Sequence, residues 1–335
     1  MNRIKYVDTL KFLAIFSIIL LHFTQIYKNV GICNIYFNNV KEIFRFGVPL
    51  FLMITGMLML NREIDLKVFF KKKVVRIVYP LIFFCLIASL LGIYHDFFLN
   101  YWYCWMIIGT YLAIPIINVF IRNAKEDELD YLILLIIISS LIFSIVKIFN
   151  LKIALDLDFF IGPSSYLILG YYLSKKEFKI TSPNKIALIS LAVFILVTIY
   201  KIYNKDYLYF NNTEWVLSLL NLSFPQIIQT ASLFIFIKYL YESSRGLFGK
   251  IRYVLEYKYI NNLILSISRS SYGIYLLHMI LLRGYIQPVF SKFSLTGTNT
   301  FILIILSSTG LLIISWIVIV ILSKIPIVKN FSGYG

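Results

Sequence analysis

The sequence predicts an all-α membrane protein, a polytopic helical bundle of about ten transmembrane helices with both termini in the cytoplasm. The first observation is composition. Of the 335 residues, 60% are hydrophobic and 14% are charged, whereas about a quarter of a soluble domain is charged. The second is that apolar stretches long enough to cross a bilayer recur along the whole chain. The third is an uneven distribution of Lys and Arg between alternate loops.

The apolar stretches follow one another with short connections, so residues 1–335 are predicted to form a single integral-membrane domain. Two of them, 44–60 and 159–174, are short and contain Gly and Pro, which predicts tilted, broken or re-entrant helices. No small-residue cleavage site follows the first stretch, which is therefore predicted to be a span and not a cleaved signal peptide. The ten predicted spans are 7–27, 44–60, 77–94, 101–121, 130–149, 159–174, 185–204, 217–240, 262–286 and 300–323.

Loop charges orient these spans. The loops on the side of both termini carry more than twice as many Lys and Arg residues as those on the other side, and the positive-inside rule assigns the richer side to the cytoplasm. The net charge of +16 is therefore interpreted as an orientation signal and a contact for anionic membrane lipids, with no nucleic acid as a partner. The richness in Ile, Lys, Asn, Phe and Tyr favours a bacterial source, and hence a multi-pass protein of the bacterial cytoplasmic membrane.

The first span, VDTLKFLAIFSIILLHFTQIY at residues 7–27, carries Lys11 and His22. Eleven residues are close to three helical turns, so the two side chains share one stripe about 16 Å apart along the axis. His22 then lies beyond the midplane, where an ionisable group is costly and indicates a functional site. A neutral imidazole at this depth can take a proton from a hydroxyl. The alternative is that His22 only hydrogen-bonds a neighbouring helix.

The second span, FRFGVPLFLMITGMLML at residues 44–60, is interrupted by Gly47, Pro49 and Gly56. These residues permit a broken helix and a close approach of the backbone to a ligand. The alternative is a kinked helix whose glycines only allow close packing.

The basic run KKKVVRIVYP at residues 71–80 places Lys72, Lys73 and Arg76 at helical spacing, on one face at the predicted cytoplasmic mouth. Such a face suits the phosphates of a nucleotide-bearing donor. The alternative is an ordinary positive-inside anchor.

The stretch SRSSYGIYLLHMILLRG at residues 268–284 contains a second intramembrane histidine, His278, at a depth similar to that of His22. Tyr275 lies one turn before His278, within reach of a shared polar cavity. Arg269 is predicted to be buried in the inner third of the membrane and to need a partner, either donor phosphate or a carboxylate.

In YWYCWMIIGTYLAIP at residues 101–115, Trp102, Tyr103 and Trp105 stand at the predicted start of a span. They fit the aromatic belt of the outer interface, or alternatively line a mouth that binds sugar rings. The cysteines have no metal-type spacing and no His, Asp and Glu cluster is present, so no metal site is predicted.

Taken in order, these stretches resemble acyltransferase family 3, the integral-membrane acyltransferases that modify cell-envelope glycans. The family opens with a basic residue, usually Arg, followed by ten residues and His. Here DTLKFLAIFSIILLH has Lys11 in the Arg place and His22 in the His place. VPLFLMITGMLM has Thr55-Gly56 where Ser-Gly is common in the family.

The later blocks resemble the family as well. KKKVVRIVYP matches a basic run that ends in R-x-x-x-P through Arg76 and Pro80. WYCWMIIGTYLAIP, YLILGYYLSKK and SYGIYLLH complete the resemblance over nearly the whole chain. The length is similar to that of short glycan O-acetyltransferases, such as those acting on enterobacterial common antigen.

The resemblance implies an O-acetyltransferase with acetyl-CoA, or another acyl-CoA, as the donor substrate and no tightly bound cofactor. It implies a hydroxyl of a cell-envelope glycan or lipid-linked saccharide as the acceptor. His22 is then the catalytic base or a transient acyl carrier, Lys11 helps to hold the donor or orients the site, and Arg76 with Lys72 contacts phosphates. Lys11 departs from the family, which usually has Arg at this place, and lysine lacks the bidentate geometry of arginine. With this departure, a larger acyl group such as succinyl is an alternative to acetyl.

Two other functions are alternatives. A transporter or flippase of a lipid-linked sugar or an acylated intermediate would also use buried His and Arg residues and broken helices. The two halves of the sequence, however, show no repeat symmetry. The third possibility is a membrane sensor or scaffold with an inactive site.

Overall fold

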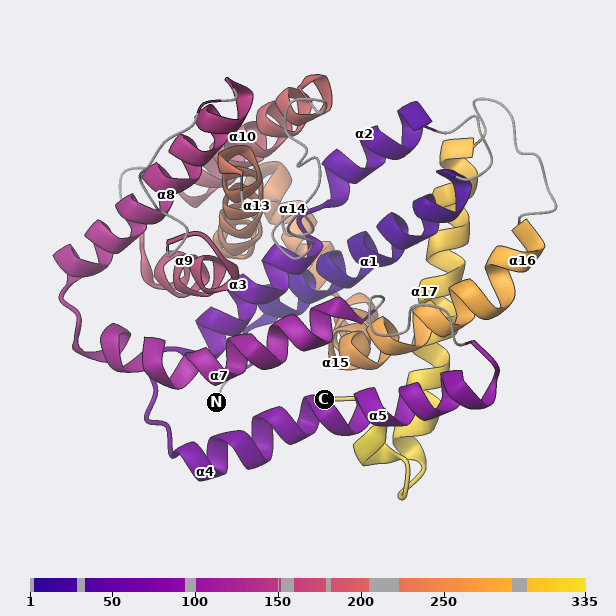
Figure 1. The fold of residues 1–335 in the computed structure, drawn as a ribbon. Helices are drawn as coiled ribbons and strands as arrows, with labels where there is room; N and C mark the ends of the chain where they lie inside the picture. The colour runs from indigo at the N-terminus through magenta and orange to yellow at the C-terminus, as the bar shows by residue number, and fades with distance from the viewer. Residues whose placement is uncertain are drawn as a thin grey trace. The chain divides into compact units, whose positions relative to one another are not determined.

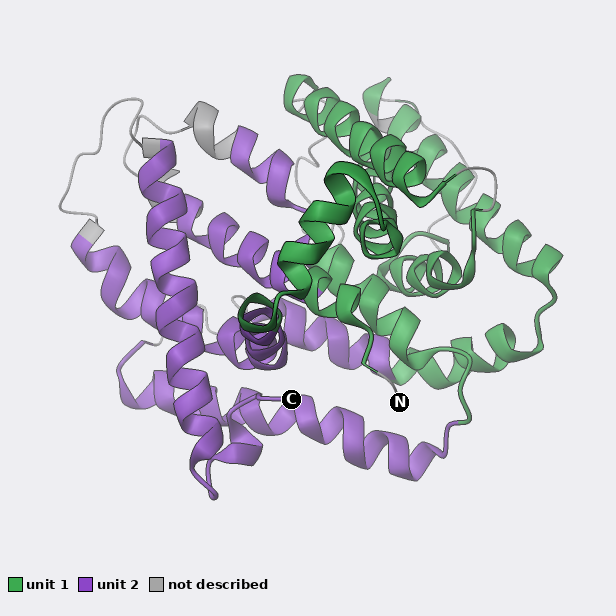
Figure 2. Ribbon diagram, turned by 180° about the vertical axis from the view of Figure 1, so that it is seen from behind, with its two compact units in different colours: residues 1–10, 48–63, 112–261 green, residues 11–47, 64–111, 262–335 purple. Residues whose placement is uncertain are grey.

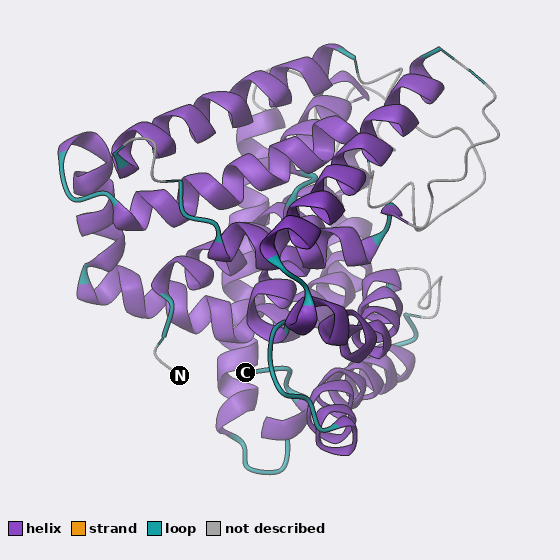
Figure 3. Cartoon of the chain, turned by 90° about the vertical axis from the view of Figure 1, so that its left-hand side faces the viewer, coloured by secondary structure: helices purple, strands orange, loops and turns teal. Residues whose placement is uncertain are grey.

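The structure is a computed structural model that describes residues 3–28, 34–93, 101–149, 151, 160–178, 182–204, 223–290 and 300–335. In these residues all regular secondary structure is helical, and none of them forms a strand (Figure 1, Figure 3). The predicted all-α class is therefore confirmed. The longer helices are α1 (Lys5–Lys28), α2 (Asn34–Phe44), α3 (Gly47–Met59), α5 (Val75–Leu90), α7 (Trp102–Asn123), α8 (Glu126–Ile148), α9 (Pro163–Lys175), α10 (Pro183–Tyr203), α13 (Phe224–Glu242), α14 (Gly246–Glu256), α15 (Lys258–Leu281) and α17 (Thr300–Lys324). The shorter ones are α4 (Leu66–Phe69), η1 (Phe70–Val74), η3 (Leu282–Ile286), α16 (Gln287–Phe290) and η4 (Lys329–Phe331).

The chain is a multi-pass membrane protein. Each predicted span overlaps a helix, and seven helical stretches of the described residues are long and apolar enough to cross a membrane. The helices α9, α13 and α15 are not among these seven, and α9 has only 13 residues, fewer than a straight crossing needs. A count of ten spans and cytoplasmic termini therefore stay predictions. The seven stretches are Lys5–Thr24, Asn39–Met59, Leu66–Leu90, Trp102–Asn123, Glu126–Val146, Pro183–Tyr203 and Phe301–Lys324.

The helices form two compact units, each assembled from three separate stretches of the chain (Figure 2). Unit 1 contains residues 1–10, 48–63 and 112–261, and unit 2 contains residues 11–47, 64–111 and 262–335. All the residues predicted above to bind substrates or to act in catalysis belong to unit 2. The single-domain organisation of residues 1–335 stays a prediction.

Proline and aspartate mark where several helices begin. The helices α9, α10 and α13 carry Pro163, Pro183 and Pro225 in their first turns, where a backbone N–H has no partner within the helix. The short α4 begins after Asp65, whose carboxylate accepts a hydrogen bond from the N–H of Val68 at 2.8 Å.

Glycines bring α3 and α9 of unit 1 into direct backbone contact. A Cβ atom on Gly56 would overlap the backbone of Leu167, and one on Gly170 would overlap the backbone of Met53. Only glycine permits this approach, which is how small residues join helices in membranes. The predicted break in 44–60 is confirmed at its beginning, because α2 ends at Phe44 and α3 starts at Gly47. For Gly56, the packing alternative agrees with the structure.

Lys238 of α13 is buried, and its ammonium donates hydrogen bonds to the backbone carbonyls of Leu173, Ser174 and Lys176 at 3.1, 3.1 and 2.9 Å. The last carbonyls of a helix such as α9 have no partner inside it. Lys238→Met is therefore expected to lower the free energy of unfolding by about 1–3 kcal/mol, measured as a lower Tm in detergent. Lys185→Met, at an exposed position, is the control, and equal Tm values for the two variants would contradict the capping role.

Candidate functional site

The two histidines on α1 and α15 meet within unit 2. His22 Nδ1 and His278 Nε2 lie 2.8 Å apart, and the two rings are nearly parallel, at 3°. His278 is fully buried and His22 is half-buried. The contact puts both rings at one level, as expected from their positions along the two predicted spans.

The hydrogen bonds of the pair define where its protons lie. His278 Nδ1 is 3.1 Å from the carbonyl oxygen of Ile274, and a carbonyl only accepts, so Nδ1 carries a hydrogen. The Nε2 atom of a neutral His278 is then an acceptor, and His22 donates to it through its own Nδ1–H. His22 Nε2 therefore keeps its lone pair, and it has no hydrogen-bond partner among the residues that the structure describes. Bonding to a neighbouring helix thus uses one nitrogen of His22 and leaves the other available as a base.

Three tyrosines form a cluster next to His278. The ring of Tyr275 lies 5.6 Å from that of His278, and the rings of Tyr101 and Tyr103 lie 6.1 and 5.2 Å from that of Tyr275. All three tyrosines are buried. The Tyr101 hydroxyl also donates to the carbonyl of Leu276 at 2.6 Å, which attaches the start of α7 to α15.

The two tryptophans take different positions from these tyrosines. Trp105 is 48% exposed, and Trp102 is half-buried with its ring against that of Tyr103, at 6.5 Å. The residues of YWYCW whose rings contact that of Tyr275 are thus Tyr103, which was predicted to belong to the aromatic belt, and Tyr101, which no sequence pattern singled out. Helical spacing offered a signal for this difference. Trp102 and Trp105 are three residues apart and share one face of α7, which leaves Tyr103 on another face.

A row of residues three apart winds around α15 from the surface to the histidine pair. Arg269 is exposed, Tyr272 is half-buried, and Tyr275 and His278 are buried. Nine residues of helix separate Arg269 from His278, about 13.5 Å along the axis. Arg269 is therefore not buried inside the protein, because α15 turns this position away from the protein interior, and its depth in the membrane stays a prediction.

The basic run lies on two kinds of helix. Lys72 and Lys73 belong to η1, a π-helix, and Arg76 belongs to α5. The predicted α-helical register is therefore wrong at the two lysines, since a π-helix bonds residue i to i+5. The hydroxyl of Tyr272 donates to the carbonyl of Ile77 at 2.8 Å, which attaches α5 to α15 beside Arg76.

Three cations of this region have no acidic side chain as a partner among the described residues. Lys72, Arg76 and Arg269 are exposed, and no acidic side chain pairs with any of them among the residues that the structure describes. By contrast, Arg122 and Lys176 of unit 1 form ion pairs with Glu63 and Asp130 at 3.4 and 3.3 Å. Lys72, Arg76 and Arg269 therefore carry positive charge that no acidic side chain of the described residues neutralises.

The segment after α17 crosses both arginine-bearing helices. The ring of Phe331 stacks on that of Tyr79 of α5 at 5.8 Å. The N–H of Gly335 donates to the carbonyl of Arg269 at 2.8 Å, and the Gly335 backbone contacts the guanidinium of Arg76. This segment therefore holds α5 and α15 together where Arg76 and Arg269 emerge.

Two further cations belong to the surroundings of the pair. Lys11 lies on the same regular helix as His22, which confirms the shared stripe, and about 16 Å separates the two residues along the axis. Arg283, in the π-helix η3 five residues after His278, is half-buried and lies within electrostatic range of His22. The sequence analysis did not select Arg283, although an arginine inside the predicted span 262–286 is itself a signal. Among the described residues, no group of His, Cys, Asp or Glu side chains is arranged to hold a metal ion.

Comparison with known proteins gives one family match. Residues 4–320 match a family model described as an acyltransferase domain. The matched stretch includes every site residue described above, from Lys11 to Arg283. No curated protein and no solved structure matches the chain.

Proposed function

The chain belongs to acyltransferase family 3 and is a membrane acyltransferase, and from this premise we propose that it moves an acetyl group from acetyl-CoA to a hydroxyl of a cell-envelope glycan or lipid-linked saccharide. The observation that carries the proposal is the hydrogen bond between His22 Nδ1 and His278 Nε2. This bond fixes the ring of His22 and leaves its Nε2 atom as a half-buried base. A base that takes a proton from an alcohol is what transfer from a thioester to a hydroxyl requires.

In the proposed reaction, His22 Nε2 takes the proton of the acceptor hydroxyl as its oxygen attacks the thioester carbonyl. The tetrahedral intermediate then expels the CoA thiolate, the C–S bond breaks, and His22 returns the proton to sulfur. His278 is a positioning residue, because it holds the Nδ1–H of His22 and stabilises the imidazolium that forms. Arg283 offers a cation to the oxyanion of the intermediate.

Four cations are proposed to bind the phosphates of the donor: Lys72, Lys73, Arg76 and Arg269. The absence of acidic partners at Lys72, Arg76 and Arg269 supports this role. Tyr272 and Tyr275 then line the way from Arg269 to His278 for the pantetheine arm. Trp102, Trp105 and the tyrosines of α7 are proposed to contact the acceptor, since aromatic rings stack on sugar faces.

Arg76→Gln and Arg269→Gln are each expected to raise KM for acetyl-CoA about tenfold or more while leaving kcat nearly unchanged. A hydrogen bond to a charged group contributes about 1.5–3 kcal/mol, and a factor of ten corresponds to about 1.4 kcal/mol. The measurement is the rate of acetyl transfer against acetyl-CoA concentration. Arg122→Gln, which removes a cation already paired with Glu63, should keep the KM of the unaltered protein. A fall in kcat with KM unchanged would contradict phosphate binding.

The proposal is tested with purified protein in liposomes, acetyl-CoA labelled in the acetyl group, and a glycan extract. Label in the glycan that alkali removes indicates an ester and supports O-acetylation. Label that remains in acetyl-CoA while the glycan crosses the membrane would favour the transporter. Label bound to the protein without acceptor would indicate that His22 carries the acyl group. A parallel assay with succinyl-CoA identifies the acyl group.

A further inference from the structure

The helix α14 (Gly246–Glu256) is amphipathic and too short to cross a bilayer. Its 11 residues are about 16 Å long, roughly half of the hydrocarbon thickness. It lies between α13 and α15, and Tyr257 alone separates its last residue from the first residue of α15. Its two faces have different surroundings, and these indicate its function.

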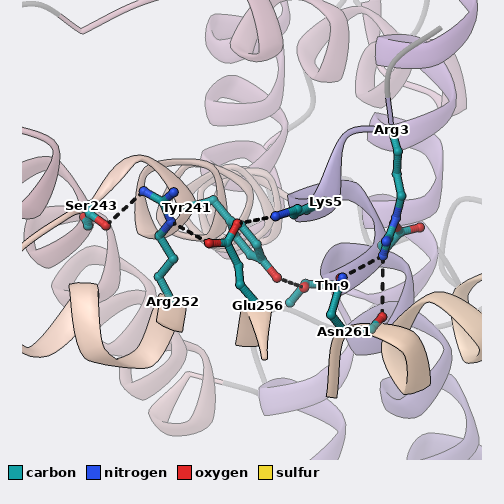
Figure 4. Close-up of polar contacts among 9 residues, drawn as sticks. Arg3, Lys5, Thr9, Tyr241, Ser243, Arg252, Glu256 and Asn261 are labelled. Carbon is teal, nitrogen blue, oxygen red and sulfur yellow. Dashed lines mark hydrogen bonds and ion pairs between the residues drawn. The ribbon is translucent and has the colours of Figure 1, made fainter. Parts of the chain in front are cut away.

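One face attaches α14 to the rest of unit 1. The ring of Phe248 packs on that of Phe236 at 5.8 Å. The carboxylate of Glu256 accepts hydrogen bonds from Arg252 at 3.1 Å and from Lys5 at 2.9 Å (Figure 4). Burial raises the pKa of Glu256, but the hydrogen bonds from Lys5 and Arg252 lower it more, so this carboxyl stays ionised at neutral pH.

Further contacts continue this attachment toward the start of α15. Arg3 joins Asp8 at 2.7 Å and donates to the side chain of Asn261 at 2.9 Å, and the hydroxyls of Thr9 and Tyr241 lie 2.7 Å apart (Figure 4). The orientation of α14 within unit 1 is therefore fixed by polar contacts, and its opposite face must point away from unit 1.

The opposite face is an exposed apolar stripe. Leu247, Ile251 and Val254 are spaced four and three residues apart and are 69%, 37% and 52% exposed, so they form one line along the helix. Tyr253 and Tyr257 border the stripe and are also exposed. On a helix that does not span the membrane, such a stripe needs another apolar environment to cover it.

Three cations accompany the stripe. Arg245, Lys250 and Lys258 are exposed, and none of them pairs with an acidic side chain in the described part of the chain. Arg252, by contrast, faces unit 1 and is paired with Glu256. The outward surface of α14 thus combines apolar residues, tyrosines and unneutralised positive charge.

We propose that α14 lies flat on the membrane surface and binds anionic phospholipids. In this arrangement Leu247, Ile251 and Val254 insert at the boundary of headgroups and acyl chains, as in other interfacial amphipathic helices. Arg245, Lys250 and Lys258 contact headgroup phosphates, and each adds electrostatic attraction to an anionic surface. The tyrosines lie at headgroup level, where amphipathic rings are enriched.

A lipid surface fits better than a protein partner for two reasons. The stripe is narrow and continues into tyrosines, which is typical of an interface between water and lipid. All three free charges have one sign, which complements a uniformly anionic surface. Because α14 leads directly into the helix that carries Arg269 and His278, lipid binding also fixes the beginning of that helix.

The test uses the full chain in nanodiscs of phosphatidylcholine with or without phosphatidylglycerol. A nitroxide is attached to Val254→Cys, and a second is attached to Glu126→Cys, an exposed position at the first residue of α8. The background has Cys33, Cys85 and Cys104 replaced by Ser. The nitroxide at 254 is expected to be relaxed several-fold more by oxygen than by a water-soluble nickel complex, and the one at 126 to show the reverse.

The binding of anionic phospholipid by the three cations is tested separately. Phosphatidylglycerol should increase the depth of the nitroxide at 254, and Arg245→Gln, Lys250→Gln and Lys258→Gln combined should reduce retention of phosphatidylglycerol in native mass spectrometry about tenfold or more. Lys175→Gln, at the exposed lysine that ends α9, is the control. Equal water accessibility at 254 and 126 would overturn insertion and leave the stripe to a protein partner. Insertion that is the same in both lipids, with retention unchanged in the triple variant, would overturn the anionic-lipid site.

Discussion

Replacing His22 with alanine is expected to lower kcat/KM for acetyl transfer by roughly 10²–10⁴-fold, the usual contribution of a positioned general base. The acceptor hydroxyl then has no group at Nε2 to take its proton, while the basic residues proposed to bind the donor are intact. The measurement is label transfer in proteoliposomes, with Tm recorded to show that the variant is folded. Transfer at the unaltered rate in His22→Ala would contradict the base assignment.

The matched variant is His278→Ala, because His278 acts only through His22. Its expected loss is smaller, about 10–100-fold, since His22 keeps its lone pair but loses the acceptor that orients it. The double variant should be no less active than His22→Ala, because residues that act as one unit are not additive. Losses that multiply in the double variant would show that the two imidazoles act independently.

The second large effect concerns folding. Gly170→Ala is expected to lower the free energy of unfolding by about 1–3 kcal/mol or more, because its Cβ would overlap the backbone of Met53. A backbone cannot move aside as a flexible side chain can, so α3 and α9 would have to separate. The measurements are Tm in detergent and the monodisperse fraction in gel filtration.

The chain offers controls at two other helical glycines. A Cβ on Gly109 or Gly310 would meet no atom within 4 Å, so alanine there should be neutral or stabilising by up to about 1 kcal/mol. The predicted effects thus have opposite signs for the same chemical change. A Tm for Gly170→Ala as high as that for Gly109→Ala would contradict the close contact of α3 and α9.

Hydropathy was sufficient to predict the long apolar helices of this protein, because length and apolar character are properties of a local stretch. The span expected at 185–204 is α10, Pro183–Tyr203, and the one expected at 300–323 is α17, Thr300–Lys324. The common level of His22 and His278 was also predictable, since an α-helix rises by a constant 1.5 Å per residue.

What could not be predicted depends on how helices rotate and bond locally. The exposure of Arg269 is determined by the rotation of α15 about its axis. Which aromatic residues contact Tyr275 is determined by how α7 and the residue before it face α15. Hydropathy is also insensitive to the difference between i→i+4 and i→i+5 bonding, so the π-helix at Phe70–Val74 went unpredicted. Which nitrogen atoms of the histidine pair carry hydrogen follows from the carbonyl of Ile274, which accepts from His278 Nδ1. No sequence motif indicates this backbone contact.

If Arg269 binds donor phosphate as proposed, its separation from the histidine pair limits which acyl donors fit. A small activated acetyl such as acetyl phosphate is far shorter than the approximately 13.5 Å that separates Arg269 from His278 along the helix axis, so it would not reach from the guanidinium to the histidine pair. A thioester on a long flexible carrier would span this separation. Under the proposed function, the spacing along one helix therefore favours a donor with a long carrier, independently of the identity of the acceptor.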